Sequence, residues 1–157
     1  MAKGAAGAGS TADREIETTR VFDAPRERVF QMWTDPKHVV QWWGPDGFTT
    51  TIETMNVRPG GAWRFVMHGP DGTDYPNLVV YSEVVRPARL AYTHGSDEEP
   101  DQFIVTVDFA DEGGKTRLSM RAVFKTAEAL RDVIEKHRAV EGMHQTLGRL
   151  RDYLKSN

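Results

Sequence analysis

The 157-residue sequence predicts an α+β domain in which a curved antiparallel sheet wraps around a long C-terminal helix. Six consecutive segments between Thr49 and Phe124 alternate apolar and polar residues and are joined by short turns, which favours an antiparallel meander. Such a sheet has one apolar face that must be covered. The long apolar stripe that can cover it lies in residues 126–155.

A strand and two short helices are expected before these six segments. Residues 15–22 are rich in β-branched side chains and predict the first strand. Pro25 opens a helix that ends by Thr34, since the missing N–H of proline has no partner at a helix start. Asp35 is a good N-cap for a second helix, which reaches Trp43.

Turns rich in glycine and proline divide the rest of the chain into strands. The strands are expected at residues 49–57, 62–68, 78–85, 90–94, 103–109 and 116–124. In the second of them, the period of two places Trp63, Phe65 and Met67 on one face, which we assign to the inside of the sheet.

Residues 126–155 predict a single amphipathic helix of about 28 residues. Thr126 can cap its N-terminus. The apolar stripe continues at spacings of four, three and four residues through Met143, Leu147, Leu150 and Leu154. An irregularity is expected near Gly142, because glycine weakens a helix interior by ~1 kcal/mol.

The composition sets limits on domain organisation and function. Residues 1–13 are rich in glycine and alanine and are expected to form a flexible tail, with residues 14–157 as one domain. The absence of cysteine excludes a disulfide scaffold, an iron–sulfur cluster and thiol catalysis. A net charge of −3 provides no electrostatic footprint for nucleic acid. No apolar run approaches ~18 residues, so no membrane span is predicted, and a cytoplasmic location is expected.

A cavity is expected between the sheet and the C-terminal helix, because a strongly curved sheet cannot contact a straight helix along its whole length. Such gaps are preferred sites for small molecules. The candidate ligand-contacting residues are Trp33, Trp42, Trp43, Trp63, Phe65, Met67, Tyr81, Tyr92, His94, Val105, Val107, Met120, Met143 and Leu147. Methionine adapts to varied partners, and tryptophan adds one N–H donor to a large apolar area. The alternative that these residues form plain core stays open.

Several short motifs occur together along the chain. They are Ala24-Pro25, Trp33-Thr34-Asp35-Pro36, Trp42-Trp43-Gly44-Pro45, Val57-Arg58-Pro59-Gly60-Gly61 and Pro87-Ala88-Arg89-Leu90-Ala91-Tyr92-Thr93. With them, residues 14–155 resemble the SRPBCC (START/Bet v 1-like) superfamily, and more narrowly the bacterial branch of the family named after the activator of the heat-shock-protein-90 ATPase. The resemblance implies a helix-grip β-α-α-β6-α fold, in agreement with the order derived above. It also implies a cavity for lipids, sterols, polyketides or other apolar molecules.

Three hypotheses for function follow. The first is binding of a small hydrophobic or aromatic ligand in the cavity, with no assigned physiological role. The second is a cyclase- or hydrolase-like enzyme that uses Tyr92, His94 or an inward carboxylate, although the chain has no Gly-x-Ser-x-Gly elbow and no catalytic residue is assigned. The third is a chaperone-associated interaction module.

A chaperone partner is not expected, because residues 1–13 are far too short to form the additional N-terminal domain of such an activator. The histidines lack the His-x-His or His-Glu-x-x-His spacing of metal sites, so no metal is expected, and no cofactor is implied. Whether the chain forms a homodimer is left open.

Overall fold

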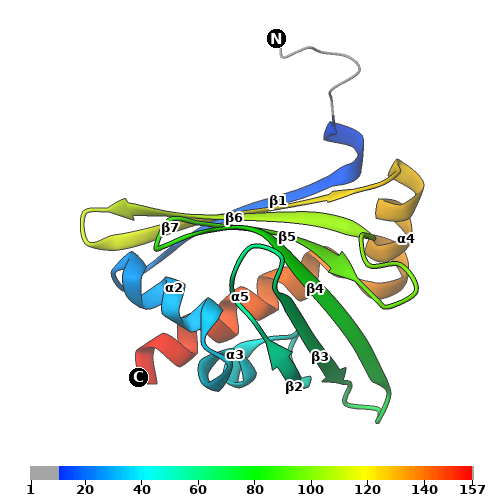
Figure 1. The fold of residues 1–157 in the computed structure, drawn as a ribbon, viewed down its shortest axis with the longest axis horizontal. Coiled ribbons are helices and arrows are strands. Elements are labelled where there is room, and N and C mark those ends of the chain that lie inside the picture. The colour runs from blue at the N-terminus through cyan, green and yellow to red at the C-terminus, as the bar shows by residue number, and fades with distance from the viewer. Residues whose placement is uncertain (1–10, 157) are drawn as a thin grey trace.

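Seven antiparallel strands form one sheet in the order β1-β7-β6-β5-β4-β3-β2 in the computed structural model, which describes residues 11–156. The strands are β1 (Glu15–Phe22), β2 (Thr49–Met55), β3 (Ala62–His68), β4 (Asp74–Val85), β5 (Arg89–Gly95), β6 (Phe103–Glu112) and β7 (Lys115–Phe124). The last six strands form a meander, and β1 pairs with β7 at its end. The predicted curved sheet is confirmed (Figure 1).

Helices lie on the concave side of this sheet and at one of its ends. They are α2 (Arg26–Thr34), α3 (Pro36–Trp42), α4 (Ala127–His137) and α5 (Ala139–Ser156). Figure 1 shows α5 running beneath the sheet, with α2 and α3 beside it. The Asp35 side chain accepts a hydrogen bond from the Lys37 N–H at 3.0 Å, which confirms the predicted N-cap of α3.

The C-terminal helix differs from the prediction, because it is divided into two helices at Arg138. This residue has φ 49° and ψ 49°, a left-handed conformation that ends α4. Gly142, where the irregularity was expected, lies inside α5 and donates its N–H to the Arg138 carbonyl at 2.9 Å. The turn is needed because α4 packs on β7 and on a short 3-10 helix (Ala12–Arg14), whereas α5 crosses the concave face.

Strand β4 begins at Asp74, four residues before the predicted start at Leu78. The added segment pairs with β3, from His68 opposite Asp74 onward, and extends that hairpin past the end of β5. Pro76 is tolerated there because β5 has ended and this edge of β4 needs no ladder hydrogen bond. This extended hairpin forms one side of a surface pocket next to the space between the sheet and α5.

The core lies between the concave face of the sheet and the helices. Trp63 and Phe65 are each 1% exposed, which agrees with their inward assignment on β3. The α5 residues Leu147 and Leu150 are fully buried opposite the sheet.

Residues 1–10 lie outside the described residues, so the flexible tail remains a prediction for them. No helix within residues 11–156 is long and apolar enough to cross a membrane.

The position of the helix break predicts the effect of two glycine exchanges. Arg138→Gly is expected to raise the free energy of unfolding by on the order of 0.5 kcal/mol, because a left-handed residue with a Cβ is strained. Gly142→Ala is expected to raise it by a similar amount, because alanine favours a helix interior and its Cβ would lie 3.4 Å from Pro45, an ordinary contact. Urea unfolding measures both. A loss of stability on Arg138→Gly with none gained on Gly142→Ala would place the break at Gly142 instead.

Candidate functional site

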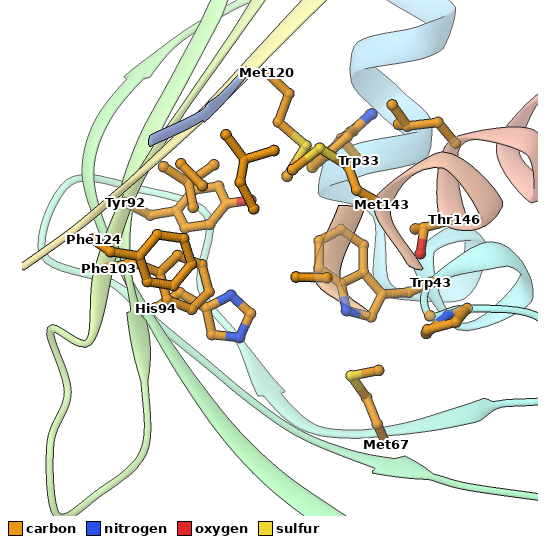
Figure 2. A pocket seen from close by; sticks show the side chains of 17 residues that line it. Trp33, Trp43, Met67, Tyr92, His94, Phe103, Met120, Phe124, Met143 and Thr146 are labelled. Carbon is orange, nitrogen blue, oxygen red and sulfur yellow. The ribbon is translucent and has the colours of Figure 1, made fainter. Parts of the chain in front are cut away.

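An apolar cavity of about 200 Å³ lies between the sheet and α5 (Figure 2). Its wall is made by Ile16, Trp33, Trp43, Gly44, Pro45, Met67, Tyr92, His94, Phe103, Val105, Met120, Ala122, Phe124, Ala139, Met143, Thr146 and Leu147. None of these residues carries a carboxylate, an ammonium or a guanidinium group. The wall is therefore suited to an uncharged molecule.

The strands contribute to this wall through their period of two. Tyr92 and His94 point inward from β5, and Met120, Ala122 and Phe124 point inward from β7. Ala122 is 3% exposed and has the smallest of these side chains, so it leaves room where larger neighbours would fill the core. Met143 and Thr146 close the opposite side from α5 (Figure 2), and Leu147 of the same helix also lines the cavity.

The four tryptophans form one connected cluster at the end of the sheet. Trp43 contacts Trp33, Trp42 and Trp63 with ring centroids 4.9–5.4 Å apart, in edge-to-face arrangements. Trp42 donates its Nε1–H to the Met32 carbonyl at 3.1 Å and is fully buried. Trp33 and Trp43 face the cavity, while Trp42 and Trp63 lie behind them. The cluster thus joins α2 and α3 to the sheet and closes one end of the cavity.

Arg149 of α5 attaches that helix to the loop after α3. Its Nη1 donates hydrogen bonds to the carbonyl oxygens of Gly44 at 2.8 Å and Pro45 at 3.0 Å. Gly44 has φ 107°, a conformation that favours glycine. A second link joins His38 of α3 to Tyr153 of α5 at 2.8 Å. The sequence does not signal this role, because Arg149 is one of several basic residues in this helix.

His94 has a defined hydrogen-bond partner. Asn77 donates its Nδ2–H to the Tyr75 carbonyl at 2.8 Å, which places the Asn77 Oδ1 toward His94. The His94 Nε2 lies 2.8 Å from this oxygen. Aromatic rings of Phe65, Tyr92 and Phe103 surround the imidazole. Burial lowers the pKa of His94 to about 4, so the imidazole is neutral near neutral pH.

Tyr92 places a hydroxyl group at the cavity wall without a partner. Its oxygen is buried and makes no hydrogen bond within residues 11–156. Burial raises the pKa of this hydroxyl above its ordinary value, so it stays protonated and can donate. The Tyr81 hydroxyl is also buried and unpartnered, but Tyr81 does not line the cavity.

A wider outer pocket of about 680 Å³ adjoins the cavity. It shares with the cavity the residues Pro45, Met67, His94, Phe103, Phe124 and Ala139. Its other sides come from the extended β3–β4 hairpin, including Tyr75, and from the α4–α5 junction at residues 136–139. The two spaces together connect the apolar interior with the protein surface.

The structure separates the predicted ligand-contacting residues into two groups. Those that line the cavity are Trp33, Trp43, Met67, Tyr92, His94, Val105, Met120, Met143 and Leu147. The others are buried in the core beside it and do not line it: Trp42, Trp63, Phe65, Tyr81 and Val107.

Several residues of the cavity wall were not among the predicted ligand-contacting residues. Phe103 and Phe124 follow the same inward alternation as Val105 and could have been included on that signal. Pro45 and Ala139 carry no such signal, since they belong to a loop and to a helix start. No group of three or more metal-binding side chains occurs in the part of the chain that the structure describes.

The lowered pKa of His94 predicts a pH-dependent stability. In the unfolded chain the imidazole has its ordinary pKa of 6.5, so it takes up a proton as the pH falls from about 6.5 to about 4, while the folded form does not. The free energy of unfolding should fall in this window, by on the order of 2 kcal/mol. His94→Gln keeps a donor for Asn77 and should remove this component. Urea unfolding at several pH values measures the free energy of unfolding of both proteins. If it changes with pH in the same way in the wild-type protein and in His94→Gln, the lowered pKa does not belong to His94.

Comparison with known proteins connects this cavity fold to a family. The chain is similar to the crystal structure of protein Ms6760 from Mycobacterium smegmatis, with a TM-score of 0.84, 25% identity and coverage of 94% of each chain. It is similar to protein CV1439 from Chromobacterium violaceum, with a TM-score of 0.78, 27% identity, and coverage of 88% of this chain and 95% of the other. No curated protein matches the sequence.

The AHSA1 protein from Silicibacter pomeroyi shares the fold, with a TM-score of 0.73, 23% identity, and coverage of 90% of this chain and 97% of the other. The profile of one protein family, described as Activator of Hsp90 ATPase homolog 1-like protein, matches residues 23–155. This match spans most of the chain, including the cavity wall from Trp33 to Leu147. The chain therefore belongs to the family of Activator of Hsp90 ATPase homolog 1-like proteins.

Proposed function

We propose that this protein binds a small apolar or aromatic molecule in the cavity between the sheet and α5. The observation that carries the proposal is an apolar cavity of about 200 Å³ that is bordered by buried core residues. Protein interiors contain few voids larger than a water molecule, so a space of this size is larger than an ordinary packing defect.

The size and lining of the cavity indicate the class of molecule. In one engineered protein, an apolar cavity of about 150 Å³ binds benzene. The present cavity has room for a ligand of one or two rings, and its methionines can adjust to the shape of that ligand. The rings of Trp33, Trp43 and Phe103 provide faces and edges for aromatic contact.

Two further observations support the proposal. The fold of the family is known for a ligand-binding cavity. The outer pocket at the α4–α5 junction provides a route from the surface to the cavity, through residues that both spaces share. An enclosed void without such a route would exchange ligand only through local unfolding.

Binding is tested with 2-methylnaphthalene as an apolar two-ring probe. We expect the tryptophan fluorescence to change, since Trp33 and Trp43 are at the wall. At 100 times its dissociation constant, the probe should add about 2.7 kcal/mol to the free energy of unfolding. If neither quantity changes for this probe or for naphthalene and indole, the proposal is wrong.

A cavity-filling variant locates the binding site. Ala122→Leu places extra methyl groups in the cavity, so affinity for 2-methylnaphthalene should fall at least about tenfold, while stability without ligand stays equal or rises. Ala110→Leu is the matched control, because Ala110 is exposed on β6 and does not line the cavity. Calorimetric titration of both variants measures the effect; equal affinities would place the ligand elsewhere.

A further inference from the structure

The polar groups on the cavity wall limit what the ligand can be. If the cavity binds a small apolar molecule, as proposed above, these groups determine which functional group that molecule carries. Two wall residues, Tyr92 and His94, stand two positions apart on β5 with ring centroids 6.5 Å apart, on the same face of the strand. Of the other polar groups of the wall, Thr146 already donates its hydroxyl to the Gly142 carbonyl at 2.8 Å, and the Trp33 indole N–H is a donor that has no partner among the described residues.

The hydrogen bonds around Asn77 determine the tautomer of His94. Because Asn77 uses Nδ2 to donate to the Tyr75 carbonyl, the atom that faces His94 is Oδ1, which can only accept. The His94 Nε2 must therefore carry the proton. In the neutral ring Nδ1 then has a free lone pair, and no hydrogen bond reaches it from any residue in the range 11–156.

The neighbouring Tyr92 has the opposite requirement. Its buried hydroxyl lacks a partner among the described residues, and Figure 2 shows the oxygen at the cavity end of the ring. Leaving a buried hydroxyl unpaired is costly, and such groups in native structures call for an explanation. The wall therefore presents a donor, the Tyr92 O–H, and an acceptor, the His94 Nδ1, on two side chains of the same face of β5.

We infer that the ligand carries a hydroxyl group on its apolar skeleton, and that this hydroxyl donates a hydrogen bond to His94 Nδ1 and accepts one from the Tyr92 hydroxyl. A ketone or ether oxygen can accept from Tyr92 but cannot donate to His94. A carboxylate would place a negative charge beside the Nδ1 lone pair in a wall without cations. A hydroxyl on an aromatic or aliphatic ring satisfies both groups at once.

The test compares 2-naphthol with 2-methylnaphthalene, which differ by a hydroxyl against a methyl group of similar size. The measured quantity is the Kd of 2-methylnaphthalene divided by the Kd of 2-naphthol, obtained by calorimetry near neutral pH. Comparing this ratio between variants cancels the different solvation of the two probes. Loss of one hydrogen bond corresponds to about a tenfold change.

The variants are Tyr92→Phe and His94→Phe, each of which should lower the ratio about tenfold relative to the wild-type protein. Tyr81→Phe is the matched control, since it removes another buried unpartnered hydroxyl that does not line the cavity, and it should leave the ratio unchanged. A ratio that stays at the wild-type value in either Tyr92→Phe or His94→Phe overturns the inference. If neither probe binds the wild-type protein, the proposed function is wrong. If both probes bind but the ratio does not change in a variant, the proposed function stands and only the inference about the hydroxyl group is wrong.

Nitrogen-15 NMR of the wild-type imidazole provides a reading that does not depend on any variant folding. Nδ1 of His94 should show the shift of an unprotonated nitrogen and Nε2 that of an N–H. Addition of 2-naphthol should move the Nδ1 signal toward the hydrogen-bonded range, and 2-methylnaphthalene should not. A protonated Nδ1 in the free protein, or equal responses to both probes, contradicts the inference.

Discussion

A curved sheet and a straight helix cannot remain in contact along their whole lengths, and this constraint shapes the molecule. The sheet must bury its concave face, and α5 is the long helix that crosses it (Figure 1). Arg149 attaches α5 to the carbonyls of Gly44 and Pro45, while Leu147 and Leu150 contribute to the core. Between the supported helix and the sheet, side chains from β5, β6 and β7 leave the cavity open.

The tryptophan cluster explains how the domain has both an open cavity and a well-buried hydrophobic core. Trp42 and Trp63 contribute apolar burial behind the wall, and Trp33 and Trp43 have one side in the cluster and the other toward the cavity. Burying rings of this size contributes several kcal/mol each. The cavity lies between this cluster and the inward side chains of β5, β6 and β7.

Much of this arrangement could be predicted from local patterns, and the rest depends on distant contacts. Alternation along the strands was enough to place Tyr92, His94 and Val105 on the inner face, and the caps at Asp35 and Thr126 followed from their side chains. The break at Arg138 was not predictable, since tertiary packing imposes a left-handed conformation on a residue that does not favour it. The roles of Arg149 and Asn77 likewise depend on partners that are close only in the folded chain.

The most direct test of the central claim is a methyl NMR titration of the protein labelled at its methionines. Met67, Met120 and Met143 line the cavity, while Met32 and Met55 lie away from it. On addition of 2-methylnaphthalene, the methyl signals of Met67, Met120 and Met143 should shift strongly and together because of the ring current of the bound probe, and those of Met32 and Met55 should stay in place. Shifts concentrated at Met32 or Met55, or no shift at any methionine, would contradict the account.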